Sequence, residues 1–242
     1  MPDHRVVTRE EWRTEREKLL AEEKELTRRG DELTKKRQEL PWVKVETEYS
    51  FETKDGTKSL ADLFDGRSQL MIYHFMFGPT YETGCPVCSS IADSLTGQVA
   101  HLGARDTTLI CSSRGPLEKL LAFRDRMGWE FDWVSAETDF HRDLGYFSTE
   151  EELKPWLESG NIPATVTQNA EMCGTDVAGY VAEGPGLSVF ALDGGDVYGT
   201  YTSTARGLEG PAMSYYQLLD RTPAGRNESP DEPLWVRYHD EY

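Results

Sequence analysis

Apolar runs and amphipathic stretches take turns along the middle of the chain, which predicts alternating strands and helices. Residues 69–77 form a nearly continuous apolar run, as expected for a central strand covered on both faces. Further buried strands are predicted at residues 107–112 and 130–134. Helices are predicted between them, at residues 89–102 and 116–127. Because strands that alternate with helices form parallel sheets, this region indicates an α/β fold.

Hairpin signals stand on either side of this region. Residues 49–53 precede an Asp55-Gly56 turn, and residues 186–192 and 197–202 flank an Asp-Gly-Gly-Asp turn. A closing helix is predicted at residues 211–219. The hairpins add antiparallel strands, so the predicted sheet is mixed.

A long charged helix is predicted ahead of the sheet. Thr8 and Glu11 have the spacing of a capping box, and Pro41 ends the helical pattern. Its apolar positions recur every seven residues, at Trp12, Leu19, Leu26, Leu33 and Leu40. One apolar position per heptad is too few for a strong coiled coil. The stripe lies either along the chain's own domain or against a second subunit, and we expect a homodimer to which this arm contributes.

Residues 139–183 break the alternating pattern and predict an insertion or a functional loop. The segment is rich in Gly, Thr, Glu and Asn, with one predicted helical piece at residues 149–156. It is too long for an ordinary connection. After the closing helix, residues 226–242 form a polar tail whose Trp235, Tyr238 and Tyr242 can dock it onto the domain.

The strongest chemical signal is the pair Cys85-Pro86-Val87-Cys88, at the junction between a predicted strand and a predicted helix. The unpaired N–H groups and the dipole of a helix N-terminus lower the pKa of a thiol placed there. The resulting thiolate is the form that attacks disulfides and binds metals. The spacing also lets the second thiol reach the first.

Charge and composition exclude several classes of function. The 242-residue chain has a net charge of -17, which argues against nucleic acid and against anionic membrane surfaces as partners. No stretch approaches the ~20 apolar residues of a membrane span, and the charged first residues have no signal-peptide centre, so we expect a cytoplasmic protein. In a reducing compartment a Cys-x-x-Cys pair indicates redox or metal chemistry. Glycine-rich nucleotide and phosphate loops are absent from the sequence, so no organic cofactor is expected.

The order strand, Cys-x-x-Cys, helix, strand, helix, hairpin, last helix resembles the thioredoxin fold. Nearly the whole chain also resembles a bacterial family known as domain of unknown function 899, regarded as thioredoxin-like. Seven segments carry this resemblance: residues 73–79, 84–89, 113–120, 126–129, 184–190, 201–207 and 235–240. It implies a thioredoxin-like central mixed sheet flanked by helices, with an N-terminal helical arm (1–40), a domain (41–225) carrying the insertion (about 139–183) before the C-terminal hairpin, and a tail (226–242). The family supplies no settled activity.

The thioredoxin resemblance implies roles for four residues. Cys85 takes the place of the exposed attacking thiol and Cys88 that of the buried resolving thiol. Pro185 fits the cis-proline that faces the thiols. His74 falls where thioredoxins bury an acidic residue, and a histidine there is suited to relay a proton for Cys88. Glu82, rather than Thr or Ser, stands three residues before Cys85, so a peroxiredoxin-type peroxidase site is not expected.

The sequence therefore favours a thiol–disulfide oxidoreductase that acts on a disulfide-containing or oxidised-sulfur substrate. The alternative is a copper site, or a zinc site, built from Cys85, Cys88 and His74 with His141 as a possible addition, and serving an oxidase or oxygenase. The other candidates have plainer interpretations. Cys111 is expected in the core, Cys173 as an incidental loop cysteine with a third redox thiol as the alternative, and His141 at the surface. Arg114 and Arg206 are expected in salt bridges, with an acidic substrate as the alternative.

Overall fold

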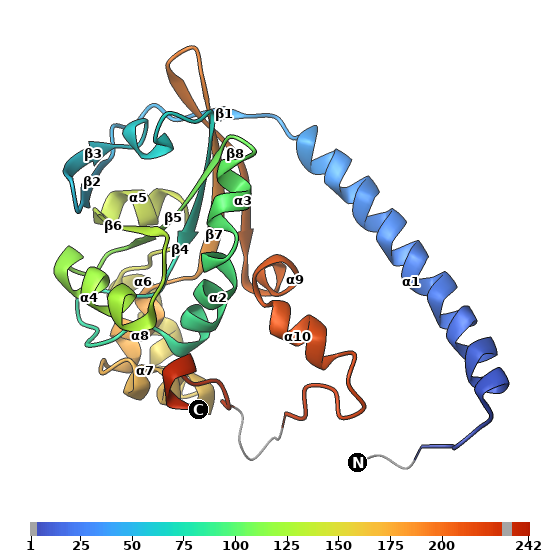
Figure 1. Ribbon diagram of the computed structural model, residues 1–242. Coiled ribbons are helices and arrows are strands. Elements are labelled where there is room, and N and C mark those ends of the chain that lie inside the picture. The colour runs from blue at the N-terminus through green and yellow to red at the C-terminus, as the bar shows by residue number, and fades with distance from the viewer. Residues whose placement is uncertain (1–3, 229–233) are drawn as a thin grey trace.

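The centre of the molecule is a mixed sheet of eight strands in the computed structural model, which describes residues 4–228 and 234–242 (Figure 1). The strands are β1 (Val43–Lys44), β2 (Ser50–Thr53), β3 (Gly56–Ser59), β4 (Gln69–His74), β5 (Thr107–Ser113), β6 (Asp132–Ala136), β7 (Gly186–Asp193) and β8 (Asp196–Thr204). Their order in the sheet is β1-β8-β7-β4-β5-β6-β2-β3. The expected central strand and both hairpins are therefore present.

Helices join and flank these strands. They are α1 (Arg9–Gln38), α2 (Pro86–Thr96), α3 (Val99–Gly103), α4 (Leu117–Met127), α5 (Thr138–Asp143), α6 (Glu150–Leu157), α7 (Ala164–Met172), α8 (Val177–Ala182), α9 (Glu209–Ala212) and α10 (Ser214–Leu219). Short 3₁₀ turns lie at Asp62–Phe64, Ala205–Leu208 and His239–Glu241. The helix expected at residues 89–102 is two helices, because α2 ends at Thr96 with Gly97 as its C-cap, and α3 begins at Val99. None of the helices in the described part of the chain is long and apolar enough to cross a bilayer.

The strand pairing gives the thioredoxin-like α/β fold that the sequence predicts. β4 pairs in parallel with β5, β7 pairs antiparallel with β4, and β8 pairs antiparallel with β7. Helix α2 follows β4 and α4 follows β5, as in a unit of parallel strands joined by crossing helices. β6 extends the parallel part, the β2–β3 hairpin pairs with β6, and β1 pairs with the outer side of β8.

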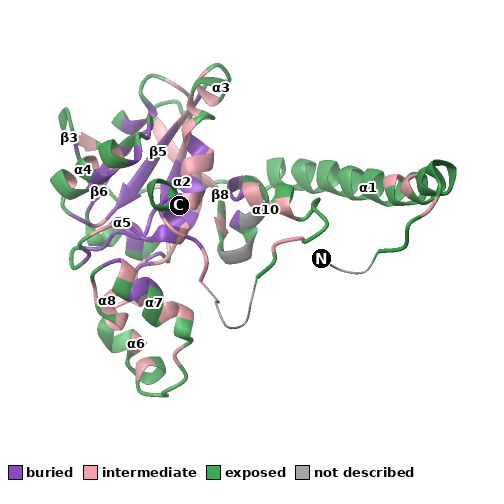
Figure 2. Cartoon of the chain, turned by 60° about the horizontal axis from the view of Figure 1, so that its bottom comes forward, coloured by how far each residue is buried: buried purple, intermediate pink, exposed green. Residues whose placement is uncertain are grey.

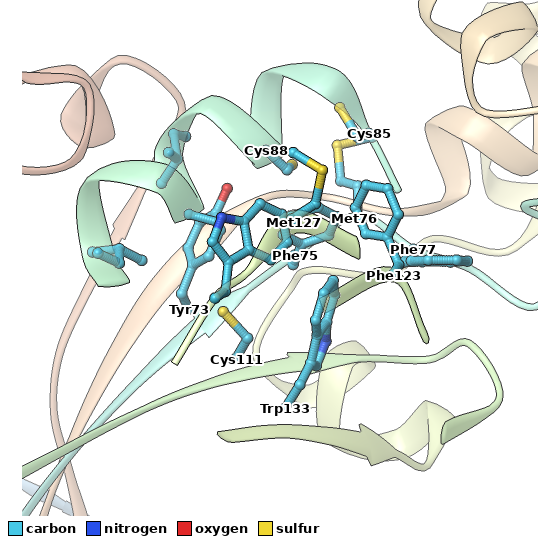
Figure 3. Packing of buried hydrophobic residues seen from close by; sticks show 14 of the residues in the cluster. Tyr73, Phe75, Met76, Phe77, Cys85, Cys88, Cys111, Phe123, Met127 and Trp133 are labelled. Atoms are coloured by element: carbon cyan, nitrogen blue, oxygen red, sulfur yellow. The ribbon is translucent and has the colours of Figure 1, made fainter. Parts of the chain in front are cut away.

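The two faces of the sheet bury different clusters of side chains. Along β4, Leu70 and Ile72 pack on one face with residues such as Phe51 and Phe190. Tyr73 packs on the other face, in a larger aromatic cluster that also holds both motif cysteines (Figure 3). Since successive side chains of a strand point to opposite faces, this alternation divides the apolar side chains of β4 between the two clusters.

The insertion is more ordered than the sequence suggests. Only the helix near residues 149–156 is predicted, whereas residues 138–182 hold the four helices α5 to α8. Helix α6 has the signal that a sequence reveals, a capping box between Thr149 and Glu152. Helices α7 and α8 have nine and six residues, too short to show a clear periodic pattern. They pack against each other below the sheet in the view of Figure 2.

The arm α1 runs away from the sheet with no buried residue (Figures 1 and 2). The expected capping box of Thr8 and Glu11 is present. Leu19 is 51% exposed and Leu26 72% exposed, so the apolar stripe is not covered by its own domain. Near the end of the arm, Arg37 lies over the ring of Tyr201, with 5.7 Å between the guanidinium carbon and the ring centroid.

A first prediction concerns a close approach at the start of β7. A Cβ atom on Gly186 would overlap the ring of Tyr146, which stacks on His74. We expect Gly186→Ala to lower the free energy of unfolding by about 1–3 kcal/mol, the usual cost of overpacking. Denaturant unfolding measures the difference. Gly97→Ala is the matched control, because its φ is -71° and a Cβ there meets no atom within 4 Å; equal stability of the two variants would contradict the argument.

A second prediction concerns assembly. An uncovered apolar stripe along a thirty-residue helix is expected to pack against another chain, and we predict a homodimer in which α1 contributes to the interface. Light scattering of the full chain against a chain that begins at Pro41 measures the change. The triple variant Leu19→Gln, Leu26→Gln, Leu33→Gln leaves the domain intact and is expected to give monomers as well. Monomers in the unaltered protein would rule out this role of the arm.

Candidate thiol redox site

Cys85 lies at the N-terminus of α2, directly after the loop that leaves β4. It is the N-cap residue of the helix, and Pro86 takes the first helical position, where a missing N–H is harmless. The backbone N–H of Cys85 donates to the carbonyl of Met76 at 3.2 Å. Its own carbonyl accepts from both the N–H and the hydroxyl of Ser89, each at 2.9 Å. These bonds fix the position of the Cys85 side chain on the helix.

The insertion closes over the loop before Cys85. The carbonyl of Cys173, at the end of α7, accepts hydrogen bonds from the N–H groups of Glu82 (2.9 Å) and Thr83 (3.2 Å). The hydroxyl of Tyr81 donates to the carbonyl of Tyr180 in α8 at 2.9 Å, and the two rings stack 6.1 Å apart. Helices α7 and α8 therefore form a cover that is hydrogen-bonded to the loop.

The tail completes the enclosure, as its aromatic residues suggest. The Tyr238 hydroxyl donates to the carbonyl of Gly84 at 2.7 Å, and its ring lies edge-on to Phe123 at 5.5 Å. Tyr238 is 3% exposed. The predicted docking of the tail is thus made beside the thiols.

Three thiols meet inside this enclosure. The thiols of Cys88 and Cys173 lie close to that of Cys85 in the same buried cluster, and the Cys85 sulfur lies 3.5 Å from the hydroxyl oxygen of Tyr180. Cys85 is only 1% exposed, so the exposed position expected for the attacking thiol is wrong. Cys88 is also 1% exposed, and Cys173 is fully buried. Figure 3 shows Cys85 and Cys88 next to each other beside the Tyr73 and Phe75 rings, with Cys111 and Trp133 set away from them. Cys173 is therefore a buried residue at the end of α7, packed with the two motif cysteines.

The contacts separate the three thiols in acidity. Burial opposes ionisation of Cys85, but hydrogen bonds from Cys173, Cys88 and Tyr180 and from the Cys88 N–H hold its pKa well below the ordinary value. Burial and the hydrogen bond to Cys85 raise the pKa of Cys88. A separate hydrogen bond between Cys173 and Cys85, together with burial, raises the pKa of Cys173. The site thus favours one thiolate, on Cys85, held by two protonated thiols.

His74 does not lie with the thiols. It follows Tyr73 in β4, so its side chain points to the opposite face of the sheet. There its Nε2 is 2.9 Å from the hydroxyl of Ser188, and its ring stacks on Tyr146 at 4.0 Å. Burial and the neighbouring His141 hold the pKa of His74 well below its usual range. Proton relay from His74 to Cys88 does not fit this geometry.

His141 is buried, so its expected surface position is wrong. It is 1% exposed, its Nε2 is 3.0 Å from the hydroxyl of Ser112, and its ring lies edge-on to His74 at 5.0 Å. Burial and the nearby Arg114 lower the pKa of His141 to about 3. The cysteines and the histidines of the alternative metal site lie on opposite faces. Within the described ranges, no three or more His, Cys, Asp or Glu side chains are grouped so as to hold a metal ion.

Pro185 directly precedes β7, but its peptide bond is trans. No cis peptide bond occurs in the described part of the chain, so the predicted cis-proline is wrong. The backbone around it is held by the insertion instead. The N–H of Gly184 donates to the carbonyl of Tyr146 at 2.8 Å, and Glu183 pairs with Phe147 in an isolated antiparallel β-bridge. The insertion thereby sets the course of the chain into β7.

The remaining candidates follow their plainer interpretations where the structure describes them. Arg114 forms a largely buried ion pair with Glu183 at 2.7 Å, and its guanidinium lies 3.6 Å from the centroid of the Phe147 ring. Burial raises the pKa of Glu183 to about 7, although Arg114 opposes this. Cys111 is a core residue of β5, where burial alone raises its pKa. The side chain of Arg206 lies outside the described residues.

Two contacts of the thiols were not expected from the sequence. The Tyr73 hydroxyl lies beside Cys88 and has no hydrogen bond of standard geometry to any described group. The alternation of side chains along β4 could have identified Tyr73, because only one of Tyr73 and His74 can face the thiols. Tyr180 belongs to the insertion, and no local pattern connects it with Cys85.

Fold and site together define a thioredoxin-fold protein with a cysteine pair at the start of the helix after the first parallel strand. The chain belongs to the family described as bacterial protein of unknown function (DUF899), whose model matches residues 1–242. No curated protein matches the chain.

Several solved structures share the general fold at low similarity. The bacterioferritin comigratory protein of Xanthomonas campestris is 13% identical, with a TM-score of 0.44 over 73% of this chain and 91% of that chain. The peroxidoxin BcpB of Mycobacterium tuberculosis is 12% identical, with a TM-score of 0.41 over 66% and 86%. BsSco, of the Sco family of cytochrome c oxidase assembly proteins, is 18% identical, with a TM-score of 0.40 over 74% and 92%. Likeness at this level says nothing about activity.

A third prediction follows from the lowered pKa of Cys85. A free cysteine loses its thiolate as the pH falls below about 8.5, and its alkylation slows. The alkylation rate of Cys85 should stay near its high-pH maximum down to a lower pH. Tyr180→Phe removes one hydrogen bond to the thiolate. We expect this variant to raise the pKa of Cys85. At a pH below the pKa of Cys85, alkylation by iodoacetamide should then be about fivefold slower, since one such bond is worth ~1 kcal/mol.

Rates of Cys85 alkylation across a pH series, read by peptide mass spectrometry, measure this effect. Tyr215→Phe is the matched control, because the Tyr215 hydroxyl lies 3.0 Å from that of Ser90 on the same helix. An unshifted profile in Tyr180→Phe would refute the assigned contact.

Proposed function

We propose that this protein is a thiol–disulfide oxidoreductase in which Cys85 is the nucleophile and Cys88 a resolving thiol. The observation that carries the proposal is the gathering of hydrogen-bond donors on one sulfur at a helix N-terminus. A thiolate is the species that attacks a disulfide, and these donors favour it at Cys85 alone. Cys88, three residues later on the same helix, is within reach for the second step.

The reaction has two exchange steps. In the first, the Cys85 thiolate attacks one sulfur of a substrate disulfide, a mixed disulfide forms, and the other substrate sulfur leaves as a thiolate that takes up a proton. In the second, Cys88 gives up its proton and attacks the Cys85 sulfur, which releases the remaining half of the substrate as a thiol. Two protein thiols become one disulfide, and one substrate disulfide becomes two thiols. An external thiol reductant returns the protein to its starting state.

Tyr73 takes the place that the sequence suggested for His74. Its hydroxyl contact lowers the pKa of Cys88 against the stronger effects of burial and of Cys85. Burial raises the pKa of Tyr73 well above its usual value, so this hydroxyl stays protonated. It is therefore a donor to the Cys88 thiolate as that thiolate forms, and not a base.

Burial limits the substrate. Because Cys85 is 1% exposed beneath Tyr180 and the cover, a substrate must be small or must displace α7 and α8. We propose a low-molecular-weight disulfide or oxidised-sulfur compound, reduced in the cytoplasm, where thiol reductants are abundant. No organic cofactor enters this proposal.

A metal function has less support. The four residues of the alternative copper or zinc site are divided between the faces of the sheet, so Cys85 and Cys88 would need ligands other than His74 and His141. Elemental analysis of protein purified without chelator tests this alternative directly. Near-stoichiometric copper with both thiols protected would favour it over disulfide exchange.

A fourth prediction tests the proposed function itself. We expect Cys85→Ser to lower the reduction of hydroxyethyl disulfide, measured with dithiothreitol as the electron donor, at least about a hundredfold. Cys111→Ser is the matched control, since Cys111 is equally buried but has no thiol contact, and it should keep full activity. The double variant Cys88→Ser, Cys173→Ser removes both thiols that lie close to Cys85. It should stop at the mixed disulfide, which intact-mass measurement detects. Full turnover in Cys85→Ser would overturn the proposal.

A further inference from the structure

Cys173 meets the proposed nucleophile from the insertion, and the two-step reaction gives it no role. Its thiol lies close to that of Cys85, as that of Cys88 does, and the three cysteines belong to the same buried cluster. The two neighbours reach the Cys85 sulfur from different elements: Cys88 from α2 and Cys173 from the end of α7.

The position of Cys173 is fixed by its backbone. Its N–H donates to the carbonyl of Asn169 at 2.9 Å, and its carbonyl accepts from Glu82 and Thr83 in the loop before Cys85. The next residue, Gly174, has a φ of +65°, and a Cβ there would overlap the Glu82 side chain. A turn that only glycine fits well therefore brings the end of α7, and Cys173 with it, against the loop that leads into Cys85.

We propose that Cys173 is a second resolving thiol, which competes with Cys88 for the mixed disulfide on Cys85. This proposal rests on the proposed function, because it requires Cys85 to react first. Cys173 gives up its proton to the departing substrate thiolate and attacks the Cys85 sulfur. A Cys85–Cys173 disulfide forms, the bond to the substrate breaks, and the substrate half leaves as a thiol.

The two disulfides then interconvert without net oxidation. The Cys88 thiolate can attack the Cys85 sulfur of the Cys85–Cys173 disulfide, which forms Cys85–Cys88 and frees Cys173 as a thiolate that takes the proton lost by Cys88. The first disulfide ties the cover to the site covalently, whereas the second leaves the cover held only by hydrogen bonds and side-chain packing. The choice of partner thus decides whether the site stays closed after turnover.

The experiment compares two full-length double variants, each with one possible partner for Cys85. Cys88→Ser, Cys111→Ser leaves Cys85 and Cys173; Cys173→Ser, Cys111→Ser leaves Cys85 and Cys88. Each is treated with hydroxyethyl disulfide, quenched with acid at intervals, and analysed by intact mass and peptide mapping. We expect both to pass from the mixed disulfide to an internal disulfide, which the first variant forms between Cys85 and Cys173.

As a control, the reaction of the first variant is repeated in concentrated urea, where the chain is unfolded and the two thiols meet only by chance. Closure in the folded protein should be on the order of a hundredfold faster, because the structure holds the two sulfurs together. Cys88→Ala replaces Cys88→Ser if circular dichroism shows a loss of structure.

The outcomes separate the two proposals. If the first variant stays at the mixed disulfide, or closes no faster than in urea, while the second closes, Cys173 is not a resolving thiol and the proposed function stands. If neither variant reacts with hydroxyethyl disulfide, the proposed function itself fails.

Discussion

A negative charge on a sulfur that is almost closed to water is the constraint on which the centre of this molecule depends. Burying an ion without partners costs several kcal/mol, so Cys85 can be a thiolate only if donors replace the lost water. The N-terminus of α2 supplies one, the Cys88 N–H. The others come from Cys88 itself and from the ends of α7 and α8, through Cys173 and Tyr180. The insertion is therefore part of the electrostatics of the site.

The sheet keeps a second buried polar group apart from this charge. On the opposite face His74 and His141 lie edge to face, each with a serine hydroxyl close to its Nε2. Burial lowers the pKa of both rings, so they are neutral near pH 7 and add no charge. Gly186 leaves room for Tyr146 to stack on His74. The histidines thus belong to the packing between the sheet and the insertion, while Cys85 and Cys88 lie on the other face.

A feature could be predicted from the sequence when it depends on residues close together in the chain, and not when it depends on contacts between distant segments. The central strand and the last hairpin depend on neighbouring residues, and their patterns predict them correctly. The pattern after Cys85 predicts a helix there but misses the break between α2 and α3. The position of His74 was predictable too, because a strand cannot turn Tyr73 and His74 toward the same face. The contact of Cys173 with Cys85 was not, since it depends on how two short helices fold back over a loop distant in sequence. Gly174 becomes informative only once Glu82 is known to lie against it.

The hydrogen bonds that favour the Cys85 thiolate have a consequence for redox potential. They stabilise the reduced protein, and a disulfide has no charge to receive them. Any disulfide that includes Cys85 is thereby made easier to reduce, so its potential is higher than that of a cysteine pair without such donors. Each donor that the insertion adds moves the balance further toward the dithiol. Less strongly reducing thiols would then suffice to hold the protein in its dithiol form.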